Sequence, residues 1–118
     1  MRMVVLGAVA VCVAAAPAYA AGDPVQMSRA AIVRGDYAAA EKMLSAERRV
    51  YPGRPEVLLN LAAVYANTGR VAQAADLYRS VLSEDDVLMN VTSDRVASAH
   101  DIASRGLMRL GAGQTASR

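Results

Sequence analysis

The clearest structural pattern in the sequence is found in residues 55–86, PEVLLNLAAVYANTGRVAQAADLYRSVLSEDD. Its first half carries an apolar stripe at helical spacing, formed by Leu58, Leu61, Ala62 and Tyr65. Its second half carries another such stripe, formed by Ala74, Leu77, Tyr78 and Val81. Gly69 lies between the halves, where a helix end favours a residue with left-handed backbone. The stretch therefore predicts two helices that are joined by a tight turn and packed on each other.

The residues before it repeat the same layout. Gly35 precedes Gly69 by 34 positions (69 − 35 = 34), and Ala40 precedes Ala74 by the same interval (74 − 40 = 34). An interval of this size is typical of repeat proteins in which each unit is one pair of helices. Small residues such as Ala62 and Ala74 would let the two helices of a pair approach closely.

The fixed spacing resembles the tetratricopeptide repeat, a helix-turn-helix unit. In the later unit the matching residues are Leu61, Ala62, Tyr65, Gly69, Ala74 and Tyr78. In the earlier unit they are Gly35, Tyr37, Ala40 and Pro52. The resemblance implies an all-α fold with two helical hairpins, about residues 23–54 and 55–86, that form a fragment of a right-handed superhelix.

Helix boundaries follow from capping residues, glycines and prolines. We expect helices over about residues 24–34, 37–50, 55–68 and 71–82. Residues 87–110 are expected to hold a connector, VLMNV, and a capping helix that begins at Thr92 or Ser93 and ends before Gly111. The apolar face of that helix would consist of Val96, Ala99, Ala103, Leu107 and Leu110. Residues 111–118 are expected to form a flexible tail.

Residues 1–20 have the layout of a secretory signal peptide. Arg2 precedes a charge-free apolar run, and Ala18, Tyr19 and Ala20 form a small-residue cleavage pattern. The predicted location is therefore periplasmic or secreted. A retained membrane anchor is the alternative, and a lipoprotein at Cys12 is disfavoured because Val11, before it, is not small. After cleavage we expect no contact with a membrane.

The sequence predicts no catalytic residue, no metal site and no cofactor. Ser98, His100 and Asp101 contain the residue types of a hydrolase triad, but residues two apart on a helix do not face each other. The acidic turn Glu84–Asp86 lacks the spacing of a calcium loop and is expected to be solvated. Residues 21–118 hold all 11 acidic and 12 of the 13 basic side chains, a net charge of 12 − 11 = +1, which gives no electrostatic reason to expect nucleic acid.

The resemblance implies that the first helix of each repeat lines a concave groove for a protein or peptide. The predicted groove residues are Val25, Arg29, Ile32, Leu59, Ala63 and Asn67. The groove would be mostly apolar, with Arg29 as a lone exposed cation. The alternative is that these residues pack against the capping helix and leave no open groove.

The predicted function is a non-catalytic protein-interaction module, monomeric or weakly oligomeric. One alternative is a structural or assembly subunit that stays bound to an envelope or secretion complex. Another is an enzyme that needs a second chain to complete its active site.

Overall fold

The computed structural model describes residues 22–116, and the predicted signal peptide lies outside them. The chain forms five helices and two strands within this range. The elements are α1 (Pro24–Val33), α2 (Tyr37–Val50), α3 (Pro55–Asn67), α4 (Val71–Ser83), β1 (Leu88–Thr92), β2 (Arg95–Ser98) and α5 (Ala99–Ala116). The expected all-α hairpin architecture is confirmed, and the bounds of α1 to α4 agree with the predicted ones within one residue.

Local chemistry accounts for the helix ends. The side chain of Asp23 accepts a hydrogen bond from the Val25 amide at 3.1 Å, and Asp36 accepts one from the Ala39 amide at 3.2 Å. Pro55 occupies the first turn of α3, where its missing N–H costs nothing. Gly35 and Gly69 end α1 and α3 with φ of 76° and 78°, the left-handed backbone that the sequence predicts at Gly69.

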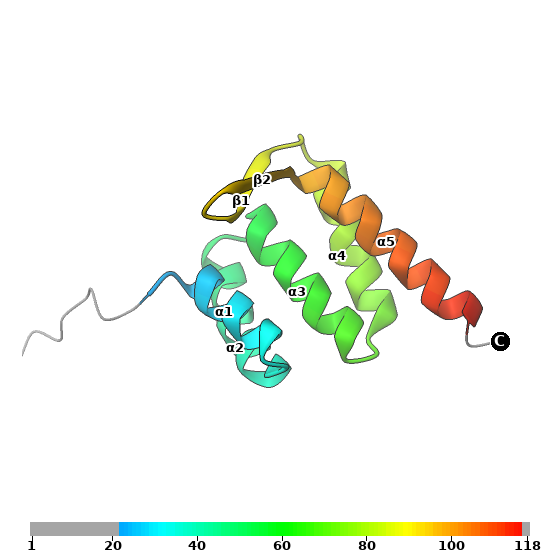
Figure 1. The fold of residues 1–118 in the computed structure, drawn as a ribbon, viewed down its shortest axis with the longest axis horizontal. Coiled ribbons are helices and arrows are strands. Elements are labelled where there is room, and N and C mark those ends of the chain that lie inside the picture. The colour runs from blue at the N-terminus through cyan, green and yellow to red at the C-terminus, as the bar shows by residue number, and fades with distance from the viewer. Residues whose placement is uncertain (1–21, 117–118) are drawn as a thin grey trace, which may run out of the picture.

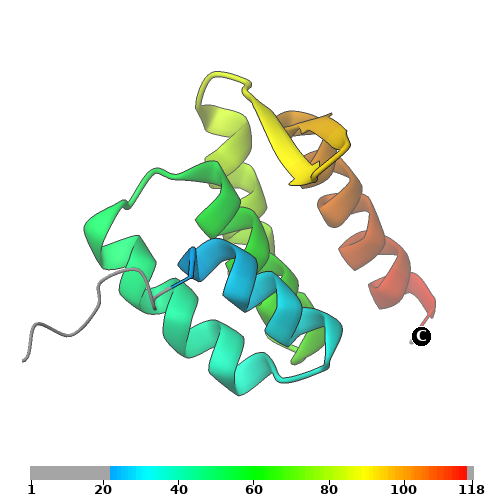
Figure 2. The same cartoon turned by 60° about the vertical axis from the view of Figure 1, so that its left-hand side comes forward.

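The helices pack as two successive hairpins. In Figures 1 and 2, α1 pairs with α2 and α3 pairs with α4, while α2 also packs against α3 and joins the hairpins. Three alanines at the close approaches, Ala40, Ala62 and Ala74, are completely buried. Larger apolar side chains fill the space around them, among them Leu44, Leu61 and Val64. The small residues thus allow the close helix packing that the repeat spacing predicts.

The prediction for residues 87–98 is wrong. This segment is an antiparallel β-hairpin, in which Leu88 pairs with Ser98 and Asn90 with Val96. Consequently α5 begins at Ala99 and not at Thr92 or Ser93, and Val96 lies on a strand. The predicted helix end is also wrong, because α5 continues through Gly111 to Ala116.

The last helix takes the place of the first helix of a third repeat. It packs against α4 and α3, as α3 packs against α2 and α1. It starts 44 positions after α3 (99 − 55 = 44), and Gly106 follows Ala62 by the same interval (106 − 62 = 44). The β-hairpin therefore acts as an insertion of ten residues (44 − 34 = 10) into the repeat spacing.

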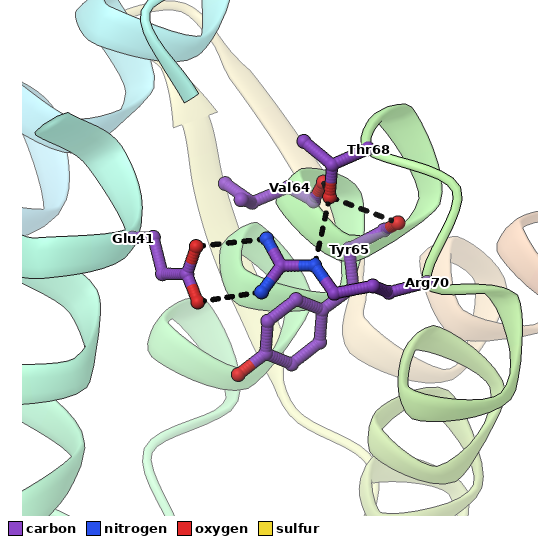
Figure 3. A network of polar contacts seen from close by, with 5 residues as sticks. All are labelled: Glu41, Val64, Tyr65, Thr68 and Arg70. Carbon is purple, nitrogen blue, oxygen red and sulfur yellow. Dashed lines mark hydrogen bonds and ion pairs between the residues drawn. The ribbon is translucent and has the colours of Figure 1, made fainter. Parts of the chain in front are cut away.

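An ion pair joins the two repeats on the side of α2. Both terminal nitrogens of Arg70 donate to the Glu41 carboxylate at 2.7 Å, and the guanidinium lies 4.5 Å from the centre of the Tyr65 ring (Figure 3). Arg70 Nε also donates to the Thr68 hydroxyl at 3.0 Å, which in turn donates to the Val64 carbonyl. The two parallel hydrogen bonds from Arg70 to Glu41 fix the α3–α4 turn against α2.

No helix among residues 22–116 is both long and apolar enough to cross a membrane.

Candidate protein-binding site

The concave face of the repeats is covered by the chain's own C-terminal part. What remains is a cavity of about 190 Å³ between α3, the β-hairpin and α5. From the repeats it is lined by Arg29, Glu56, Leu59, Asn60, Ala63 and Tyr78. From the covering elements it is lined by Met89, Val91, Ile102, Gly106 and Arg109. We call this space the concave cavity.

Arg29 joins α1 to the β-hairpin that covers the concave face. Its guanidinium donates to the carbonyl oxygen of Val91 and, at 3.5 Å, to that of Asn90, both on β1. A charged donor on two main-chain acceptors is stronger than a neutral hydrogen bond. Arg29 is therefore half-buried and bonded, and the expectation of a lone exposed cation is wrong.

The structure brings together three of the six predicted groove residues. Arg29, Leu59 and Ala63 line the concave cavity. Val25 and Leu59 are core residues, with exposed fractions of 2% and 5%. Ile32 is half-buried beside the core, and Asn67 is exposed with its amide donating to the Ala63 carbonyl at 2.7 Å. The groove is thus covered, which was the alternative that the sequence left open.

One polar atom in the concave cavity has no partner. The amide nitrogen Nδ2 of Asn60 is buried and forms no hydrogen bond with the part of the chain that the structure describes. Such a donor carries an uncompensated desolvation cost until an acceptor reaches it. A water molecule in the cavity, or an oxygen acceptor of a partner, would satisfy it.

A second, larger opening lies between the hairpin and α5. Its volume is about 480 Å³, and we call it the hairpin cleft. The hairpin contributes Leu88, Val91 and all four residues of β2, and α5 contributes Asp101, Ile102, Arg105 and Arg109. Val91, Ile102 and Arg109 line both spaces, so the hairpin cleft and the concave cavity are neighbours. The sequence did not predict the hairpin cleft.

The acidic turn fixes the start of α5. Asp86 accepts hydrogen bonds from the Ser98 hydroxyl at 2.6 Å and from the His100 amide at 3.0 Å. These bonds, that of Ser98 first, hold the pKa of the Asp86 carboxyl below its usual value. Asp86 is therefore not merely solvated, because it caps α5 and joins that helix to the base of the hairpin.

The residues considered for hydrolysis are not arranged as a triad. Ser98 Oγ is bonded to Asp86 and to the Asp101 amide, while His100 Nε2 lies 2.7 Å from the Glu84 carbonyl oxygen. Within residues 22–116 no three histidine, cysteine, aspartate or glutamate side chains are grouped so that they could hold a metal ion.

Comparison with known families agrees with this architecture. The sequence model of the tetratricopeptide repeat family matches residues 25–86, which span both hairpins. The protein therefore belongs to the tetratricopeptide repeat family, whose repeats generally mediate protein–protein interaction and are not catalytic. Neither the search of curated proteins nor that of solved structures gave a match.

Proposed function

We propose that the protein is an exported, non-catalytic module that binds a partner protein. The repeat fold supports the binding role, because repeats of this family generally mediate protein–protein interaction. The charge-free run after Arg2 and the pattern Ala18-Tyr19-Ala20 support export to the periplasm or the exterior. Purification from the native compartment and sequencing of its N-terminus tests this part. A start at Ala21 is expected, and an intact Met1 would contradict it.

The observation that carries the binding role is the repeat fold, and the Asn60 amide marks a polar position in the lining of the concave cavity. A partner side chain with a carbonyl or carboxylate oxygen would satisfy Asn60 Nδ2 and contact the apolar wall at Leu59 and Ala63. Arg29 contributes positive charge to the same wall. The cavity admits one side chain, so the remainder of the partner lies outside it.

Replacement of Asn60 tests this role. The chain is used to capture proteins from an envelope extract, and the captured partner is then purified for binding measurements. Asn60→Ala removes no hydrogen bond of Nδ2 within the described residues, so the fold should tolerate it. Affinity for the partner should fall about fivefold or more. Gln73→Ala, at an exposed position of α4, is the matched control.

The same experiment separates a recruiting adaptor from a structural subunit. An adaptor is expected to purify alone and to bind its partner reversibly. A subunit of an envelope or secretion complex would remain with that complex through purification. Failure to capture any partner above background would contradict both roles.

A further inference from the structure

One strand that lines the hairpin cleft, β2, has a free edge. The sheet of the described residues has two strands only, so β2 pairs with β1 and its other edge has no main-chain partner. All four residues of β2 line the cleft. Free strand edges are ready to pair with another extended chain.

Large apolar side chains are exposed to solvent in the same cleft. Leu88 and Val96 lie on the hairpin with exposed fractions of 76% and 56%, and Ile102 faces them from α5. Large apolar side chains at this exposure, grouped around one opening, mark a contact surface for another protein.

Positive charge lines the same opening. Arg95 comes from β2, and Arg105 and Arg109 come from α5, where an interval of four residues puts them on one side of the helix. All three are exposed, and none forms an ion pair with any residue in the range 22–116. Asp101 is the one acidic residue of the lining, so the charge of the cleft is complementary to an acidic segment.

From these three observations we infer that the hairpin cleft binds an extended acidic segment of the partner as a third strand beside β2. Main-chain hydrogen bonds to the free edge of β2 would align the segment. An apolar side chain would contact Val96 and Ile102, and carboxylates would reach Arg105 and Arg109. This inference rests on the proposed function and adds to it the chemistry of the partner.

A synthetic peptide tests the inference directly. The probe is a fluorescein-labelled octapeptide of alternating glutamate and valine, and its binding to the full chain is followed by fluorescence anisotropy. We expect saturable binding that weakens as sodium chloride rises, because salt screens the arginine–glutamate pairs. A peptide with glutamine in place of glutamate should bind about tenfold more weakly or worse. A peptide with N-methylated backbone should also lose binding, because it cannot pair with a strand edge.

Variants locate the site. Arg105→Gln and Arg109→Gln should each weaken the acidic peptide about fivefold or more, while circular dichroism stays unchanged because both side chains are exposed. Arg49→Gln, at an exposed position on α2, should leave the affinity as it is. Equal binding of the acidic and the glutamine peptide, or unaltered binding to both α5 variants, would overturn the inference. So would undiminished binding of the N-methylated peptide, which would mean that the segment is not a strand.

The affinity of the captured partner for these variants distinguishes this inference from the proposed function. If Arg105→Gln and Arg109→Gln bind the partner as tightly as the unaltered chain, the cleft is not its site, although the binding role stands. Loss of partner binding in Arg105→Gln, whose side chain lines the cleft and not the concave cavity, together with retained binding in Arg49→Gln, supports both.

Discussion

Gly106 lies against the ring of Tyr78 so closely that no side chain fits between them. A Cβ at position 106 would be 2.3 Å from Cζ of Tyr78 and 2.6 Å from each of the two Cε atoms. Tyr78 is buried, with an exposed fraction of 7%, and its burial raises the pKa of its hydroxyl. The approach of α5 to α4 therefore depends on glycine at this position.

Replacement of Gly106 should loosen α5. Gly106→Ala would force the Tyr78 ring or the helix to move, with a cost of about 1–3 kcal/mol in the free energy of unfolding. Gly111→Ala, in the same helix with nothing within 4 Å of an added Cβ, should instead stabilise by about 0.5–1 kcal/mol. Urea unfolding followed by circular dichroism measures both. Equal effects of the two substitutions would mean that α5 does not pack on Tyr78.

The close approach of α3 and α4 makes a similar prediction. Ala74 is completely buried between these helices, whereas Ala72 in the same turn is exposed. Ala74→Leu should overpack the contact and destabilise by about 1–3 kcal/mol, and Ala72→Leu should change stability by about 0.5 kcal/mol or less. Thermal unfolding of the two variants is the measurement, and indistinguishable midpoints would contradict the packing of the second repeat.

Leu59 should behave as a core residue and not as part of an open groove. Its exposed fraction is 5%, so Leu59→Ala leaves a void in the core and should cost about 2–5 kcal/mol. An open groove would instead predict lost binding with little change in stability. The unfolding midpoint in denaturant decides between these outcomes, with Leu88→Ala as an exposed leucine for comparison.

The ion pair between Glu41 and Arg70 predicts a dependence of stability on pH. The hydrogen bond from Arg70 holds the pKa of the Glu41 carboxyl below its usual value of 4.5. Because the pKa of Glu41 is lower in the folded state, the ion pair stabilises the fold fully above pH 4.5. This contribution is lost as the pH falls through the folded-state pKa, since the carboxylate is then protonated. The gap in melting temperature between the unaltered chain and Glu41→Gln should therefore be largest near neutral pH and shrink in acid. A gap that is constant across this pH range would argue against the pair.

Much of the repeat region could be predicted because its signals are local. Prolines, capping aspartates and two glycines mark the ends of α1 to α4, and the 34-residue interval places both turns. The hairpin could not be predicted in the same way. On β1 only one apolar side chain, that of Met89, is buried, and Leu88 and Val96 are exposed. The alternation of apolar and polar residues that is typical of a half-buried strand is therefore weak.

The cover over the predicted groove could not be predicted for a related reason. The register implied by the family resemblance placed Arg29, Leu59 and Ala63 on one face, where all three line the concave cavity, but it carries no information about a distant segment that covers that face. The contact of Arg29 with Val91 spans 62 positions in the sequence. Gly106 was missed as well, because a residue without a side chain does not contribute to an apolar stripe.

Site-specific photo-crosslinking in the native cell tests whether the protein binds a partner and whether the hairpin cleft is part of the binding site. A photoreactive residue would replace Val96, which is exposed in the cleft, and in a second strain Val50, which is exposed at the end of α2. We expect light-dependent coupling of one partner protein at position 96 and none at position 50. The absence of an adduct at position 96, or the same adduct at both positions, would contradict binding at the hairpin cleft.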